Sequence, residues 1–211
     1  MEQARAKLEK MLRNYIPESA VFYCTSLWKQ TPFSFKVTKK RLSRQGDYRY
    51  DLKTGIHRLT VNGDLNQYSF LITYIHEYAH LMMRESHARR VAPHGREWQE
   101  AFRKLMLPLL NDSVFTDDIL RPLSRHMRRP KASSSADHKL VIALMEYDDN
   151  GDLVPLDSLE EGQTFIFQKL LYEKITLRRT RVLCKQFANS KKYLMPKMVL
   201  VAPYEEKSFL S

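Results

Sequence analysis

One stretch of the sequence decides the fold: Asp64-Leu-Asn-Gln-Tyr-Ser-Phe-Leu-Ile-Thr-Tyr-Ile-His-Glu-Tyr-Ala-His-Leu-Met-Met83. Neither proline nor glycine interrupts it, so it predicts a single long helix. Asp64 is a favourable N-cap residue, and Gln67, three residues later, is placed to complete a capping box. We therefore expect the helix to begin just after Asp64 and to run unbroken to Met83.

The helix carries His76-Glu77-Tyr78-Ala79-His80 in its second half. Residues four apart share one helix face, so the two imidazoles point the same way and can bind one metal ion. Glu77 is placed to reach a water molecule held by that metal, as in zinc hydrolases that combine two histidine ligands with a general base. The pattern is short enough to occur by chance, but here the residues around it are apolar, and buried His and Glu side chains need a partner or a metal. Those apolar neighbours are Leu71, Ile72, Ile75, Ala79, Leu81, Met82 and Met83.

A catalytic zinc site usually has three protein ligands, so a third must come from elsewhere. The downstream candidates are His87, His94, Glu97 and Glu100. His94 is favoured because it opens a second predicted helix, residues 96–108, whose apolar stripe would dock it beside the first. Either glutamate stays open as an alternative, in a gluzincin arrangement. The metzincin pattern is excluded because it requires Gly and His where this chain has Met83 and Ser86.

These motifs carry a family resemblance. The pentapeptide from His76 to His80, followed by His94-Gly95 and the aromatic Trp98, resembles the SprT-like metalloprotease domain. That family includes the Spartan-type proteases of DNA–protein crosslink repair. The resemblance extends over residues 15–127 and implies a zincin-like fold, with zinc ligands His76, His80 and His94 and the general base Glu77. Many such proteins carry a cysteine zinc ribbon after this domain, which the two cysteines of this chain, Cys24 and Cys184, do not provide.

Length and composition limit the number of domains and the cellular compartment that we expect. The chain has 211 residues, enough for one or two domains. No apolar run is long enough to span a bilayer, and the first residues lack the apolar region of a signal peptide. Two cysteines far apart in sequence make neither a disulfide framework nor a cysteine zinc site. We therefore expect a cytoplasmic protein with no membrane partner.

The net charge of +11 is unevenly distributed. Residues 1–137 hold 24 Lys and Arg against 14 Asp and Glu, a net charge of +10, whereas residues 138–211 hold 11 against 10, a net charge of +1. A nucleic acid partner would explain the excess, and a basic surface that only aids solubility would explain it equally well. The candidate phosphate contacts are Lys39, Lys40, Arg41, Arg89 and Arg90. If Trp28 or Phe33 is exposed beside the lysines, single strands should bind more tightly through base stacking.

The order of predicted elements gives an α+β fold with two domains. Residues 1–127 form the metalloprotease domain, in which a helix at 2–15 precedes a small antiparallel sheet with strands at 33–37, 48–51 and 56–62. Residues 128–137 are a basic, Ser- and Pro-containing linker, part of an irregular stretch at 121–135 that includes His126. Residues 138–211 form a small all-β domain resembling a barrel or sandwich. Its strands are expected at 140–147, 164–168, 180–184, 193–195 and 198–201.

These observations together predict zinc-dependent hydrolysis of peptide bonds. Zn²⁺ is the expected cofactor and a protein the expected substrate, one that is bound or crosslinked to DNA according to the resemblance and the basic first half. Two alternatives stay open. One is a nucleic-acid-binding protein with a structural or inactive zinc site, although such a site would not need Glu77. The other is a metallohydrolase of non-peptide substrates.

Overall fold

The computed structural model describes residues 2–41, 44–86, 92–131, 137–148 and 153–204, which fall into two compact units, residues 1–148 and residues 149–211. Unit 1 contains α1 (Glu2–Leu12), α2 (Glu18–Gln30), β1 (Ser34–Thr38), β2 (Gly46–Asp51), β3 (Ile56–Asn62), α3 (Gln67–Ser86), α4 (Arg96–Met106), η1 (Leu107–Leu109), α5 (Asp117–Arg128) and α6 (His138–Met145). Unit 2 contains β4 (Val154–Pro155), η3 (Leu156–Ser158), β5 (Thr164–Phe167), β6 (Leu170–Leu177), β7 (Arg181–Gln186), β8 (Lys192–Pro196) and β9 (Leu200–Tyr204). The predicted α+β class is confirmed.

The sheet of unit 1 is mixed, so the prediction of a purely antiparallel sheet is wrong. Its strand order is β1-β3-β2, with β1 parallel and β2 antiparallel to the central strand β3. The chain crosses the end of β3 between β1 and β2 instead of turning back in a hairpin. Buried Asn62 holds this crossing, because its side-chain amide donates to the carbonyls of Arg41 and Arg44 and its backbone N–H donates to that of Gln45. Alternating polarity in a strand indicates which face is buried, but not which strand is its neighbour.

Helix α3 begins two residues later than the capping box predicts. The N-cap is Asn66, whose Oδ1 accepts hydrogen bonds from the backbone N–H groups of Tyr68 and Ser69 at 3.1 and 2.9 Å. Its Nδ2 donates to the carbonyl of Leu144 at 2.8 Å, so one side chain caps α3 and also ties α6 to it. Asp64 instead forms an ion pair with Lys40 at 3.4 Å.

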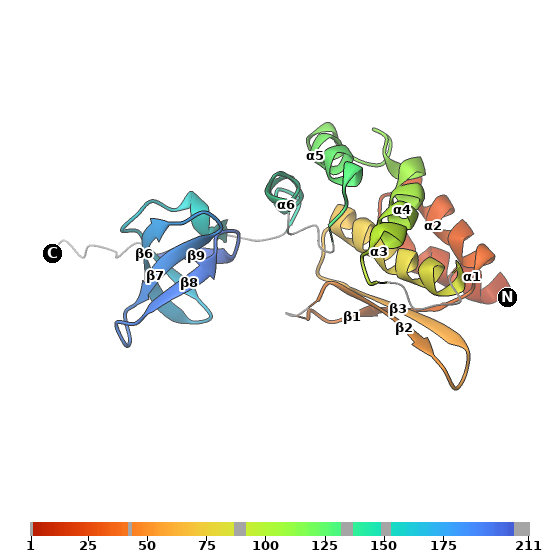
Figure 1. Ribbon diagram of the computed structural model, residues 1–211, viewed down its shortest axis with the longest axis horizontal. Helices are drawn as coiled ribbons and strands as arrows, with labels where there is room; N and C mark the ends of the chain where they lie inside the picture. The colour runs from red at the N-terminus through yellow and green to blue at the C-terminus, as the bar shows by residue number, and fades with distance from the viewer. Residues whose placement is uncertain (1, 42–43, 87–91, 132–136, 149–152, 205–211) are drawn as a thin grey trace. The chain divides into compact units, whose positions relative to one another are not determined.

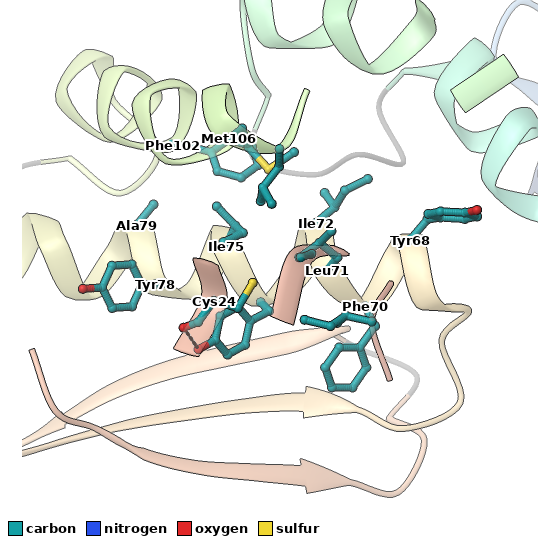
Figure 2. Packing of buried hydrophobic residues seen from close by; sticks show 14 of the residues in the cluster. Cys24, Tyr68, Phe70, Leu71, Ile72, Ile75, Tyr78, Ala79, Phe102 and Met106 are labelled. Carbon is teal, nitrogen blue, oxygen red and sulfur yellow. Dashed lines mark hydrogen bonds between the residues drawn. The ribbon is translucent and has the colours of Figure 1, made fainter. Parts of the chain in front are cut away.

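Helix α3 is the centre of the unit 1 core, since a helix that is apolar on nearly every side can be stable only when it is surrounded. The sheet forms one layer and α3 lies along it with the neighbouring helices, as Figure 1 shows. Figure 2 shows Ile75 and Ala79 facing Phe102 and Met106 of α4, while Cys24 approaches the opposite side from α2. The hydroxyls of Tyr74 and Tyr78 donate to the α2 carbonyls of Cys24 and Leu27 at 3.1 and 2.9 Å. Elements on all sides therefore fix the rotation of α3, and with it the direction in which His76 and His80 point.

Two segments after α4 are helical where the sequence predicts otherwise. Residues 121–128, predicted as part of a linker, belong to α5, which buries Ile119, Leu123, His126 and Met127 at helical spacing despite Pro122. Residues 140–147 were predicted as a strand but mostly form α6, capped by the Asp137 side chain. Short apolar runs do not distinguish strand from helix. Because α6 adds Leu140 and Leu144 to the unit 1 core, the division of the chain falls at residue 148 rather than at 128–137.

Unit 2 is a six-stranded sheet in the order β4-β9-β5-β6-β7-β8 over its own small core. The sheet does not close into the predicted barrel, because the two end strands, β4 and β8, are not paired with each other in the part of the chain that the structure describes. The longest strand, β6, was not predicted. Its alternation is hidden by Lys174, which points inward and donates to the carbonyls of Asp157 and Leu159, and by a bulge before Thr176.

Two further features concern the cysteines and the length of the helices. Both cysteines are free and buried. Within the described ranges, none of the helices has the length and apolar character that a bilayer span requires.

Candidate metal centre

Three half-buried imidazoles converge in unit 1. Helix α3 presents His76 and His80 on one face, and His94 reaches them from just before α4. Their Nε2 atoms are separated by 3.1 Å (His76 and His94), 3.0 Å (His80 and His94) and 3.3 Å (His76 and His80). These three side chains form a group that could hold a metal ion, the one such group among the residues the structure describes. The alternative ligands Glu97 and Glu100 do not belong to it.

The spacing of the three nitrogens fits a small tetrahedral ion. Ligand nitrogens about 2.0–2.1 Å from a tetrahedral Zn²⁺ lie roughly 3.3 Å from one another. A neutral imidazole has only one N–H group, so three rings whose Nε2 atoms face each other cannot satisfy one another by hydrogen bonds alone. A cation at the point of convergence would accept all three lone pairs.

His94 reaches the other two histidines through an unusual backbone conformation. Its φ is +62°, in the left-handed region that non-glycine residues rarely adopt. The turn is held by a hydrogen bond from the Gly95 N–H to the Ala92 carbonyl at 3.0 Å and by one from Gln99 Nε2 to the His94 carbonyl at 3.3 Å. Strained backbone of this kind persists where the surrounding structure enforces it, often at functional sites.

Trp98 lies beside all three rings. Its ring centroid is 4.6 Å from that of His76, 5.5 Å from that of His80 and 4.7 Å from that of His94. The Phe102 ring stacks on that of Trp98, with the two ring centroids 5.0 Å apart. Trp98 is 1% exposed, so one aromatic side of the site is dry and rigid.

Burial keeps the three histidines neutral. It lowers the pKa of His76 to about 3, helped by the charge repulsion of His80 and His94. Burial and His94 lower the pKa of His80 to about 4, and burial lowers the pKa of His94. Neutral imidazole is the form that binds metals, so the lone pairs are available at neutral pH.

Glu77 lies next to this group in a confined space. It is 7% exposed, and a Cβ atom at Gly46 would lie 2.5 Å from its Oε1, so the start of β2 must be glycine for the carboxyl to fit. Burial raises the pKa of Glu77 to about 8, assisted by Asp47. Arg41, a hydrogen bond from the Tyr48 backbone and Arg44 act in the opposite direction. A neighbouring divalent cation would also favour the charged carboxylate.

Sequence reasoning did not identify the residues of β2 and β3 that border this site. Tyr48 lies with its ring nearly parallel to that of His80, at 11° and a centroid separation of 6.4 Å. Its hydroxyl is 3.0 Å from Nδ1 of His57, and Nε2 of His57 is 3.2 Å from Glu85. The alternation of polar and apolar residues in these two strands predicts that one face of the sheet is buried. It does not predict that α3 is the element that covers this face.

The predicted phosphate contacts lie in different surroundings. Lys39 and Lys40 are exposed, whereas Arg41 donates from Nε to Asn62 Oδ1 at 2.7 Å and from Nη1 to Thr60 at 3.1 Å. Arg41 is therefore part of the crossing that leads into β2, and Arg89 and Arg90 lie outside the described residues, as does His87.

The aromatic residues considered for base stacking are not free on the surface. Phe33 is buried against Tyr78, and half-buried Trp28 donates to the Phe33 carbonyl at 2.9 Å. Base stacking on Trp28 or Phe33 would require an exposed ring beside the lysines, and neither ring meets this condition.

Comparison of the chain with protein-family models, with curated proteins and with solved structures finds no match.

The contact of Trp98 with all three histidines makes it a reporter of metal binding. Co²⁺ is an open-shell ion that quenches a fluorophore lying close to it, so it should quench most of the fluorescence of a Trp28→Phe variant, which retains Trp98 as its one tryptophan. The quenching should saturate at one Co²⁺ per chain. A Trp98→Phe variant, which retains Trp28, should respond weakly. Equal quenching of the two variants would contradict binding at this group.

The raised pKa of Glu77 predicts a pH-dependent effect on stability in chelator-treated protein. The carboxyl loses its proton above pH 4.5 in the unfolded chain but only near pH 8 in the folded one, so ionisation disfavours folding progressively across this interval. Glu77→Gln should therefore raise Tm, with a gain that grows from near pH 5 and levels off above pH 8. Glu100→Gln, at an exposed position, is the control and should show no such trend. A gain that does not change with pH would contradict the burial of an ionisable carboxyl at position 77.

Proposed function

We propose that this protein is a zinc-dependent peptidase of the SprT-like type, with His76, His80 and His94 as metal ligands and Glu77 as general base. The observation that carries the proposal is the convergence of three imidazole nitrogens within 3.0–3.3 Å, one residue from a buried glutamate. A purely structural site would have no use for a carboxyl held at that position at the energetic cost of its burial.

The donor set fits zinc. Three neutral histidines that leave a fourth position open are typical of catalytic zinc sites, whereas magnesium and calcium prefer oxygen ligands. Zn²⁺ held here would polarise a carbonyl oxygen and make a water molecule acidic enough to react near neutral pH. The protein's part is to hold the imidazoles neutral and in place, which burial and Trp98 do.

Glu77 is suited to move the proton. We assign it the role of accepting a proton from the attacking water and delivering it to the departing amine. A general base is most effective when its pKa lies near the working pH, and burial already moves the pKa of this carboxyl in that direction. The contacts with Gly46 and the Tyr48 backbone limit its motion.

Strand β2 offers a place for an extended substrate. Its one partner in the sheet is β3, as far as the described residues show, and Gly46 at its start lies against the Glu77 carboxyl. This places the free edge of β2 beside the site. A peptide segment that pairs with a free edge is held by main-chain hydrogen bonds in an extended form, which suits presentation of a peptide bond to the metal.

The substrate class and location are also proposals. The charge of +10 on residues 1–137 and the resemblance to Spartan-type proteases favour proteins bound or crosslinked to DNA. Two free, buried cysteines suit a reducing compartment such as the cytoplasm.

Replacing the base without disturbing the ligands tests the catalytic assignment. Glu77→Gln should retain one Zn²⁺ per chain and lower the rate of hydrolysis of labelled casein by at least about 100-fold, the low end for loss of a general base. The exposed-site variant Glu100→Gln should behave as wild type. Unchanged turnover would mean that another group activates the water, and lost zinc would mean that Glu77 is a ligand.

The DNA proposal predicts salt-dependent binding by unit 1. Lys39→Glu with Lys40→Glu should weaken binding of a labelled single-stranded oligonucleotide about tenfold or more at low salt. The double variant should also lower the slope of log affinity against log salt, because each phosphate contact releases counterions. The fluorescence anisotropy of the labelled oligonucleotide measures this binding. The charge variants are made in the Glu77→Gln protein, so that proteolysis does not interfere.

The matched control for charge is Lys104→Glu with Arg121→Glu, at two exposed positions whose side chains are 76% exposed. Equal weakening by both double variants would indicate a general charge effect. Absence of binding by the starting protein would leave a zinc peptidase of unknown substrate.

A further inference from the structure

A buried histidine outside the metal group connects the end of α3 to the edge strand β2. His57 is 6% exposed and lies opposite Tyr50 in the pairing of β2 with β3. Both of its ring nitrogens have partners: Nδ1 lies 3.0 Å from the Tyr48 hydroxyl, and Nε2 lies 3.2 Å from Oε1 of Glu85. His57 therefore has no free nitrogen for a metal.

The chemistry of the three groups fixes the direction of the hydrogen bonds. A carboxylate can only accept, so the His57 nitrogen that faces Glu85, Nε2, must carry a proton. In the imidazole form with a single proton, Nδ1 then carries a lone pair and accepts from the Tyr48 hydroxyl. The Tyr48 hydroxyl is thus held by His57 at 3.0 Å.

Tyr48 and its strand border the metal site at two places. The Tyr48 ring lies nearly parallel to the imidazole of His80, and Gly46, two residues earlier on β2, lies against the carboxyl of Glu77. Any restraint on Tyr48 thus restrains one metal ligand and the general base together. Tyr50 packs on His57 at 4.9 Å and lies under Arg84, whose guanidinium is 4.6 Å from its ring centroid, which completes the packing of α3 on this face.

We infer that Glu85, His57 and Tyr48 form a positioning relay for the metal centre. Glu85 fixes the tautomer of His57, His57 holds the phenol of Tyr48, and Tyr48 holds β2 against His80 and Glu77. The three are positioning residues, and none touches the reacting atoms. Through this relay Glu85, which lies five residues after His80 on α3, fixes the position of strand β2 against the same helix.

Cobalt affinity tests the relay independently of any hydrolysis. Partners that orient metal ligands typically change metal affinity or activity by about 10- to 100-fold when lost. Tyr48→Phe, His57→Ala and Glu85→Ala should each weaken Co²⁺ binding about tenfold, measured by Trp98 quenching in the Trp28→Phe background. Glu85→Gln should retain most of the affinity, because the amide carbonyl still accepts from His57.

Arg58→Ala provides the matched control, since Arg58 neighbours His57 on β3 but forms an ion pair with Asp51 at 3.2 Å. Its Co²⁺ affinity should stay within about twofold of the parent. Wild-type affinity in Tyr48→Phe and Glu85→Ala would overturn the relay, as would equal losses in Arg58→Ala. Tyr48→Phe removes one oxygen atom only, so it decides the question even if His57→Ala fails to fold.

The kinetic consequence rests on the proposed function. In casein hydrolysis, the relay variants should lower kcat more than they raise KM, because Glu77 is misplaced while the free edge of β2 still binds peptide. If the wild-type protein cleaves no peptide, the proposed function fails, and the Co²⁺ measurements still decide the relay.

Discussion

Three half-buried imidazoles whose Nε2 atoms are held 3.0–3.3 Å apart are the constraint on which the rest of unit 1 depends. Lone pairs brought this close repel one another unless a cation lies among them, and burial prevents the rings from relieving the repulsion by taking up protons. The protein must therefore supply the stability that keeps them together. It does so with α3, whose tyrosines bond to α2 and whose apolar faces pack against α4 and the sheet.

The same constraint explains features at some distance from the histidines. His94 adopts a left-handed backbone, which a short turn and the Gln99 side chain hold in place. Gly46 leaves room for the Glu77 carboxyl where any larger residue would collide with it. Buried Asn62 holds the crossing before β2, so that the strand starts at the position where its backbone meets Glu77. The strand is thus as much a part of the site as the helix.

The sequence predicts the helix that carries the motif, the α+β class and the three histidines that converge, because each follows from local spacing or from a short pattern of residue types. It does not predict Tyr48, His57 and Glu85 as neighbours, since their contact depends on which strand lies beside β3 and on which face α3 covers. The parallel pairing of β1 was missed because alternation says nothing about neighbours, and α6 because eight apolar-rich residues suit helix and strand alike. The cap of α3 lies at Asn66 rather than Asp64, as two suitable side chains were available within three residues.

The central claim is that these three histidines, and no carboxylate, hold a zinc ion. The most direct measurement is zinc content together with X-ray absorption at the zinc edge, on protein purified without added metal and on its His94→Ala variant. The account predicts about one Zn²⁺ per wild-type chain, with three imidazole nitrogens at about 2.0–2.1 Å, and a large loss of metal from the variant. Wild-type protein without stoichiometric metal, or a zinc spectrum unaffected by His94→Ala, would contradict it.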